Sequence, residues 1–269
     1  LSWTFAERAR MRIDHRIAKL ERDPVLTHRN AVRYAALWRG RGEALGLSTR
    51  LEAVAELLAG KRSGFYTHDR YAEAVGLAER AMAIQSAAWA PLAMDFRQYR
   101  TPLAMMDRAS IERDAEPARN PFSGLYTTIA ERIREWGAGC IALTVAFPGQ
   151  LLPSQILGMK LRELMPEALL LGGGPALSQF FFGMPTDAAT EGLGPFDAVV
   201  AGDGDLALPR IVDAFSRGDR ARGFIIEEQR ADLTDLPCPD FEGLPLEEYL
   251  SPKLVLPYDL ARGCYWGRC

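Results

Sequence analysis

Short apolar segments that alternate with helical segments constrain the fold of this chain more than any other feature. Apolar runs occupy residues 140–146, 168–171, 198–201 and 223–227, and helical patterns occupy residues 124–135, 153–164 and 206–215. Such alternation predicts an α/β domain in which helices cover a parallel sheet. The run Ile141-Ala142-Leu143-Thr144-Val145 has the nearly continuous apolar character of a strand that is buried on both faces.

Glycines follow two of the predicted strands. Gly172-Gly173-Gly174 comes after the run that ends at Leu171, and Gly202-Asp203-Gly204-Asp205 comes after the run that ends at Ala201. Ligands of parallel sheets bind at the carboxyl ends of the strands, where glycine lets a backbone approach a flat or phosphate-bearing ligand. A tight loop without a ligand is the alternative, because the spacing does not match the dinucleotide-binding fingerprint. We expect Asp205 to cap a helix that begins near Leu206.

The chain divides into four stretches of different character. Residues 1–118 form a helical N-terminal region or insertion, with helical patterns at 5–20, 51–58 and 71–89. Residues 119–231 carry the α/β pattern. Residues 232–259 are rich in proline and acidic groups and predict a linker, after which residues 260–269 begin a further domain.

The last two cysteines are the candidate metal ligands. Cys264 and Cys269 lie in Arg262-Gly263-Cys264-Tyr265-Trp266-Gly267-Arg268-Cys269, where the glycines allow two thiolates to converge on one metal centre. Half of a zinc site and a pair of unrelated thiols are the alternatives. Cys140 is expected to be a small core residue, and Cys238, which lies between two prolines, is expected to be inert. Because the chain begins at Leu1 and ends inside this motif, we expect it to be a fragment.

Residues 236–269 resemble the beginning of the radical SAM barrel in cobalamin-dependent radical SAM enzymes, where a proline-rich lead passes through an Arg-Gly-Cys turn into the cluster loop. The family loop has one residue fewer between its first two cysteines than the four that separate Cys264 from Cys269. The segment from Gly202 to Asp205 resembles the Gly-Glu-Gly-Glu turn of the B12-binding domains in this family, with aspartates in place of glutamates. With Thr144 at one strand end and the triple glycine after the next strand, these landmarks follow one another in the family order.

This resemblance implies a fold, three cofactors and an activity. The fold would be a Rossmann-like (flavodoxin-like) cobalamin-binding domain that leads into a truncated TIM-type radical SAM barrel. Cobalamin would contact Thr144, Gly173, Gly174, Gly202 and Gly204, and Cys264 and Cys269 would be ligands of a [4Fe-4S] cluster. The enzyme would use the cluster and S-adenosylmethionine to generate a 5′-deoxyadenosyl radical, with methylation of an unactivated carbon as the leading outcome and ring formation or rearrangement as alternatives.

A non-catalytic reading belongs to a different functional class. In that reading the chain is a corrinoid- or nucleotide-binding α/β module, and its terminal cysteines form part of a small zinc site. The Asp-x-His-x-x-Gly motif that supplies cobalt with a histidine ligand in many cobalamin proteins is absent. We therefore expect that His15, His28 and His68 do not ligate cobalt.

Charge and hydropathy narrow the range of partners. The net charge of −3 gives no general electrostatic reason to expect nucleic acid. No apolar run reaches the roughly 18 residues of a membrane span, and no secretory signal pattern is visible, so we expect no membrane partner and a cytoplasmic location. The family resemblance implies a small-molecule or peptide substrate and an electron donor such as flavodoxin or ferredoxin.

Overall fold

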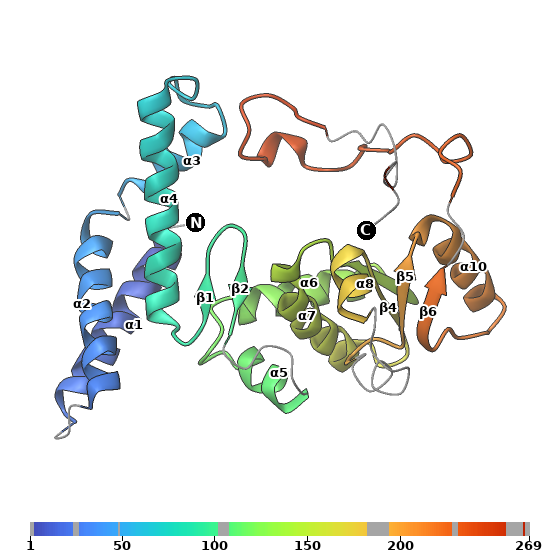
Figure 1. Cartoon of the computed structure of the whole chain (residues 1–269), viewed down its shortest axis with the longest axis horizontal. Coiled ribbons are helices and arrows are strands. Elements are labelled where there is room, and N and C mark those ends of the chain that lie inside the picture. Colours follow the sequence, from blue (N-terminus) through green and yellow to red (C-terminus); the bar gives the residue numbers. More distant parts are fainter. Residues whose placement is uncertain are drawn as a thin grey trace. The chain divides into compact units, whose positions relative to one another are not determined.

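The computed structural model describes residues 3–23, 27–47, 49–101, 108–181, 194–227, 231–256 and Trp266 (Figure 1). The chain forms two compact units. We call Leu1–Ile84 together with Ala231–Cys269 the helical unit, and Gln85–Arg230 the sheet unit. No helix in the described part of the chain is long and apolar enough to cross a membrane.

The sheet unit is built on four parallel strands in the order β3-β4-β5-β6. These strands are β3 (Cys140–Thr144), β4 (Leu169–Gly173), β5 (Ala198–Gly202) and β6 (Gly223–Glu227). The helices next to them in sequence are α6 (Ser123–Glu135), α7 (Leu151–Leu164), α8 (Pro175–Phe181) and α10 (Gly204–Ser216). The predicted α/β alternation is thereby confirmed, while α8 was not predicted.

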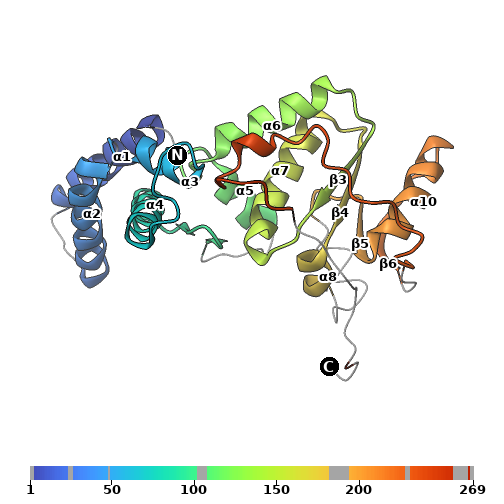
Figure 2. The same ribbon diagram turned by 90° about the horizontal axis from the view of Figure 1, so that it is seen from above.

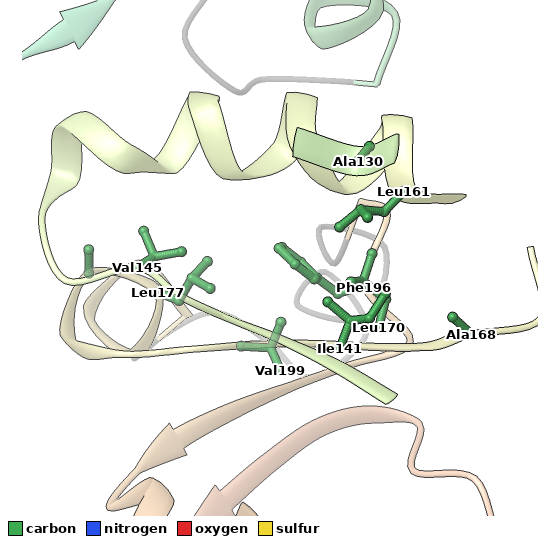
Figure 3. Close-up of a cluster of buried hydrophobic side chains, with 10 residues drawn as sticks. Ala130, Ile141, Val145, Leu161, Ala168, Leu170, Leu177, Phe196 and Val199 are labelled. Carbon is green, nitrogen blue, oxygen red and sulfur yellow. The ribbon is translucent and has the colours of Figure 1, made fainter. Parts of the chain in front are cut away.

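Two apolar cores lie on opposite faces of the sheet. On one face, Ile141, Leu170 and Val199 pack against α6, α7 and α8 (Figure 3). On the other face, Leu171 and Val200 pack against α10. Figure 2 shows α6 and α7 on one side of the strands and α10 on the other. Because successive strand side chains point to opposite faces, burial of both faces explains the continuous apolar runs of β4 and β5.

Residues 85–118 fold with the sheet rather than with the helices that precede them. They contain a small antiparallel hairpin, β1 (Ala93–Met94) and β2 (Tyr99–Arg100), which was not predicted. At its turn, Asp95 Oδ1 accepts two backbone N–H groups at 2.7 and 2.8 Å. The next helix, α5 (Arg108–Ala115), packs against α7 through a third apolar cluster. The hairpin and α5 therefore extend the sheet unit on its N-terminal side.

The helical unit contains α1 (Trp3–Glu21), α2 (His28–Leu47), α3 (Leu51–Leu58) and most of α4 (His68–Ala88), in agreement with the predicted helical character. An ion pair of 2.8 Å between Arg41 Nε and Asp14 Oδ1 joins α2 to α1. Residues 231–256 are mostly exposed and contain one short 3-10 helix, η2 (Leu246–Glu248).

The helix α10 begins earlier than predicted, which changes the role of Asp205. Its first residue is Gly204, and Asp203 occupies the N-cap position with extended backbone angles. The expectation that Asp205 caps this helix is therefore wrong, because Asp205 lies inside the first turn. A carboxylate in that turn is still favourable, since it lies near the positive end of the helix dipole.

Candidate functional site

Three of the predicted site residues end neighbouring parallel strands. Thr144 ends β3, Gly173 ends β4 and Gly202 ends β5. Thr144 and Gly173 are direct partners in the strand register. Gly174 directly follows β4, and Gly204 begins the helix after β5. The sheet therefore gathers all five predicted cobalamin-contact residues at its carboxyl edge, where ligands of open α/β sheets bind.

Two of these glycines are required by the packing of the protein itself. Gly174 has a φ of +99°, and a Cβ there would lie 2.7 Å from the carbonyl oxygen of Val145. Gly202 has a φ of +97°, and a Cβ there would lie 2.4 Å from the carbonyl oxygen of Glu227. Residues with side chains rarely adopt this backbone conformation, and backbone atoms cannot rotate away from the clash. Gly174 and Gly202 would therefore be needed even if no ligand bound.

Gly173 and Gly204 have no such packing requirement. A Cβ on Gly173 would meet Val200 O at 3.6 Å, an ordinary contact distance, and a Cβ on Gly204 would meet no described atom within 4 Å. Neither residue has a positive φ. Glycine in a strand or helix weakens that element relative to alanine. The missing side chains at these two positions are thus unexplained by the described packing and leave the backbone open to a ligand.

The loop after β3 adds an exposed aromatic side chain to this edge, which sequence reasoning did not single out. Phe147 follows the strand end by three residues and is 66% exposed. The side chain of Gln150 fixes the loop, because its Oε1 accepts the N–H groups of Ala146 at 2.9 Å and Phe147 at 3.1 Å. A Cβ on Gly149 would lie 2.8 Å from Arg97 O, so the turn of the β1–β2 hairpin lies directly against the loop.

Charged groups mark the other end of the carboxyl edge. Asp203 and Asp205 bring two carboxylates to the beginning of α10. One turn further along that helix, Arg210 forms an ion pair with Glu227, the last residue of β6. The Glu227 side chain is only 6% exposed, so the ion pair holds α10 against the end of β6. The edge thus runs from a hydroxyl and an exposed aromatic ring at β3 to charged groups at β6.

A tyrosine pair supports the hairpin beside this edge. The hydroxyl groups of half-buried Tyr99 in β2 and buried Tyr126 in α6 share a hydrogen bond. Burial raises the pKa of Tyr126 to about 12, and burial together with the neighbouring Tyr126 and Asp114 raises the pKa of Tyr99 as well. Both phenols therefore remain protonated at neutral pH, and they connect the hairpin to the helix that precedes β3.

The predicted cluster ligands Cys264 and Cys269 lie outside the described residues. Among the residues that are described, no group of three or more histidine, cysteine, aspartate or glutamate side chains could hold a metal ion. Cys140 is half-buried in the core on the α10 face, as predicted, and burial raises the pKa of its thiol. Cys238 is exposed.

The three histidines all belong to the helical unit. His15 lies in α1, His28 begins α2 and His68 begins α4. The sheet unit therefore presents its carboxyl edge without a histidine of its own. A ligand at this edge would be held by backbone groups, by Thr144 and by the side chains described above.

Comparisons with known proteins give no indication of function, so the functional argument depends on the geometry of this edge. Neither family models nor curated proteins nor solved structures match the chain. The observations that bear on function are therefore the convergence of the strand ends and the two glycines at this edge, Gly173 and Gly204, that packing does not explain. The cysteine motif at residues 264–269 adds an independent clue from the sequence.

Proposed function

We propose that this chain carries the cobalamin-binding domain and the first cluster ligands of a cobalamin-dependent radical SAM enzyme. Gly173 and Gly204 carry the proposal: both lie at the carboxyl edge of the sheet, and neither is required by packing. A broad, flat corrin ring needs close backbone approach over several loops, and side chains at these positions would obstruct it. The neighbouring ends of β3, β4 and β5 would let several loops contact such a ligand at once.

Each group at the edge would have a distinct part in holding cobalamin. The Thr144 hydroxyl can donate to or accept from an amide on the rim of the corrin ring. Phe147 offers an apolar surface that would exclude water from one side of the bound ring.

The proposed enzyme would use a [4Fe-4S] cluster and S-adenosylmethionine together with cobalamin to methylate an unactivated carbon, and these cofactors would supply the radical and methyl-transfer chemistry. Cys264 and Cys269 would ligate the cluster as thiolates. The substrate would be a small molecule or a peptide, and a flavodoxin or ferredoxin would deliver electrons. A cytoplasmic location is part of the same proposal, because reducing conditions keep such thiols available.

The cobalamin site is tested by adding bulk at the two unexplained glycines. Gly173→Val and Gly204→Val should each weaken binding of hydroxocobalamin at least about tenfold, measured by equilibrium dialysis, because the new side chain blocks the backbone approach. Gly76→Val is the matched control: Gly76 lies in α4, has no described atom within 4 Å of its would-be Cβ, and belongs to the helical unit. Unchanged affinity in both edge variants would place the corrinoid elsewhere.

The cluster is tested separately from the cobalamin site. Anaerobic metal analysis of the full-length enzyme should find iron and cobalt, and Cys264→Ala or Cys269→Ala should abolish cleavage of S-adenosylmethionine while cobalamin affinity is retained. Zinc in place of iron would favour the non-catalytic module instead. Normal deoxyadenosine production by either variant would remove that cysteine from the ligand set.

The position of the histidines leads to a separate test of the proposed cobalt site. Because the sheet unit contains no histidine, we expect the cob(II)alamin state of the full-length protein to show no superhyperfine splitting from an axial nitrogen in its EPR spectrum. Such splitting would contradict the expectation that His15, His28 and His68 stay off the metal.

A further inference from the structure

The helical unit contains a cavity that the proposed cobalamin site does not use. It has a volume of about 540 Å³ and lies between α3, the loop that follows α3, and α4. Figure 1 shows these two helices side by side. This volume falls within the roughly 300 to 1,000 Å³ typical of small-molecule sites. The cavity is therefore large enough for an organic ligand of moderate size.

The inner wall of the cavity is apolar. Val54 and Leu57 from α3 and Ala74 and Leu77 from α4 line it. Val54, Ala74 and Leu77 are each less than 8% exposed, so they belong to the interior of the unit as well as to the wall. An apolar ligand segment placed here would remove further hydrocarbon surface from water, which is favourable in proportion to the area covered.

The mouth of the cavity is positively charged. Arg50, Arg62 and Arg70 line it together with one acidic residue, Glu73. Arg50 forms an ion pair with Glu73, and Arg62 Nε lies 3.5 Å from Glu56 Oε2. The charged side chains that line the cavity therefore sum to a net charge of +2, and both ion pairs are at least 44% exposed on each side. Exposed pairs of this kind are weak and can be exchanged for a ligand anion.

Arg70 is the arginine best placed to bind such an anion. Within the described part of the chain its guanidinium has neither an ion pair nor a hydrogen bond to another residue. Its position depends on Gly64, which has a φ of +112° and whose Cβ, if present, would lie 2.6 Å from Arg70 Cδ. The glycine therefore makes room for the arginine stem beside the cavity, and the guanidinium keeps its donors for a partner.

We propose that this cavity binds a small organic anion with an apolar body, such as an acyl carboxylate or an alkyl phosphate. The apolar part would contact Val54, Leu57 and Leu77, and the anionic head would bind Arg70 and Arg62. A guanidinium donates two parallel hydrogen bonds to a carboxylate or phosphate, which gives the head group a defined orientation. None of the described residues that line the cavity is aromatic, so the site favours an aliphatic body over a stacked base.

Calorimetric titration of the full chain with decanoate and with decyl phosphate tests this site. We expect both to bind, with decanol binding at least about tenfold more weakly because it lacks the charge. Arg70→Gln should weaken decanoate binding at least about tenfold. Arg80→Gln on the same helix is the matched control, because Arg80 is exposed, donates to the carbonyl of Gly76 at 3.3 Å and is not among the described residues that line the cavity.

A second variant blocks the cavity without changing its charge. Ala53 lines the apolar wall and is only half-buried, so Ala53→Leu should fill the cavity and prevent decanoate binding while thermal stability is retained. Gly173→Val should leave decanoate binding unchanged, which separates this site from the cobalamin site. Absence of decanoate binding to the unmodified chain, equal binding by Arg70→Gln and the unmodified chain, or an equal loss in Arg80→Gln would each overturn the proposal.

Discussion

Alanine substitutions at the four edge glycines should separate into two classes of stability. Gly202→Ala and Gly174→Ala should destabilise the sheet unit, whereas Gly204→Ala and Gly173→Ala should leave it unchanged or make it more stable. The chemical change is one methyl group in every case. The difference arises from the backbone angle and from the atoms that the new Cβ would meet.

The magnitudes follow from those distances. At Gly202 the left-handed backbone costs an alanine about 1 to 2 kcal/mol, and the 2.4 Å approach to Glu227 O adds overlap that typically costs about 1 to 3 kcal/mol more. A total near 3 kcal/mol corresponds to a fall in melting temperature of about 6 to 12 °C for a unit of this size. At Gly204, the first residue of α10, alanine meets no described atom and should leave the stability unchanged or raise it by up to about 0.5 kcal/mol.

Differential scanning calorimetry of the four variants measures these effects, and hydrogen exchange of β4 and β5 amides identifies the transition that belongs to the sheet unit. The reasoning would be refuted if Gly202→Ala and Gly204→Ala changed the stability of the sheet unit equally. A stabilised Gly204→Ala protein that binds cobalamin more weakly would show that glycine is kept at this position for the ligand and at a cost to the fold.

Three further outcomes can be measured. Asp197→Ala should lower the free energy of unfolding by about 2 kcal/mol, because Asp197 Oδ2 accepts hydrogen bonds of 2.8 Å from Arg162 Nη2 and from a backbone N–H of β4. A change below about 0.5 kcal/mol in urea-induced unfolding would contradict this. Because burial raises the pKa of Tyr126 to about 12, the free energy of unfolding should fall as the pH rises from the ordinary tyrosine pKa of ~10 toward 12. The Tyr126→Phe variant should lose less stability over that interval, and an equal loss would argue against burial of Tyr126. Burial raises the pKa of Cys140, so iodoacetamide should alkylate Cys140 more slowly than exposed Cys238, as mass spectrometry of the native protein would show.

Much of the sheet unit could be predicted because its elements are long enough to show a pattern. The strands at residues 140–144 and 223–227 and the helix at residues 123–135 each agree with the prediction to within two residues. The β1–β2 hairpin has two-residue strands, and α8 has seven residues, so neither shows a recognisable period. Their positions depend on contacts with the loop after β3 and with the sheet.

In the candidate site too, some residues could be placed from the sequence and others could not. From the sequence, Thr144 and the glycines after Leu171 and Ala201 could be assigned to strand ends, because strand ends follow the apolar runs directly. The exposure of Phe147 could not be assigned, because the sequence does not show which side chains surround it in the folded protein. The helix start at Gly204 was also misplaced, since helix ends are less strongly encoded than helix interiors.

The order of apolar and helical segments by itself determined that this chain forms a parallel α/β sheet with its glycine-rich turns at one edge. Hydrophobic periodicity is a local property, and it survives in the folded protein because buried faces demand it. Only the tertiary structure decided which of these glycines the packing requires and which it does not. That distinction depends on Val145 lying against Gly174 and Glu227 lying against Gly202, and these contacts join residues 25 or more positions apart that meet only when the strands pair.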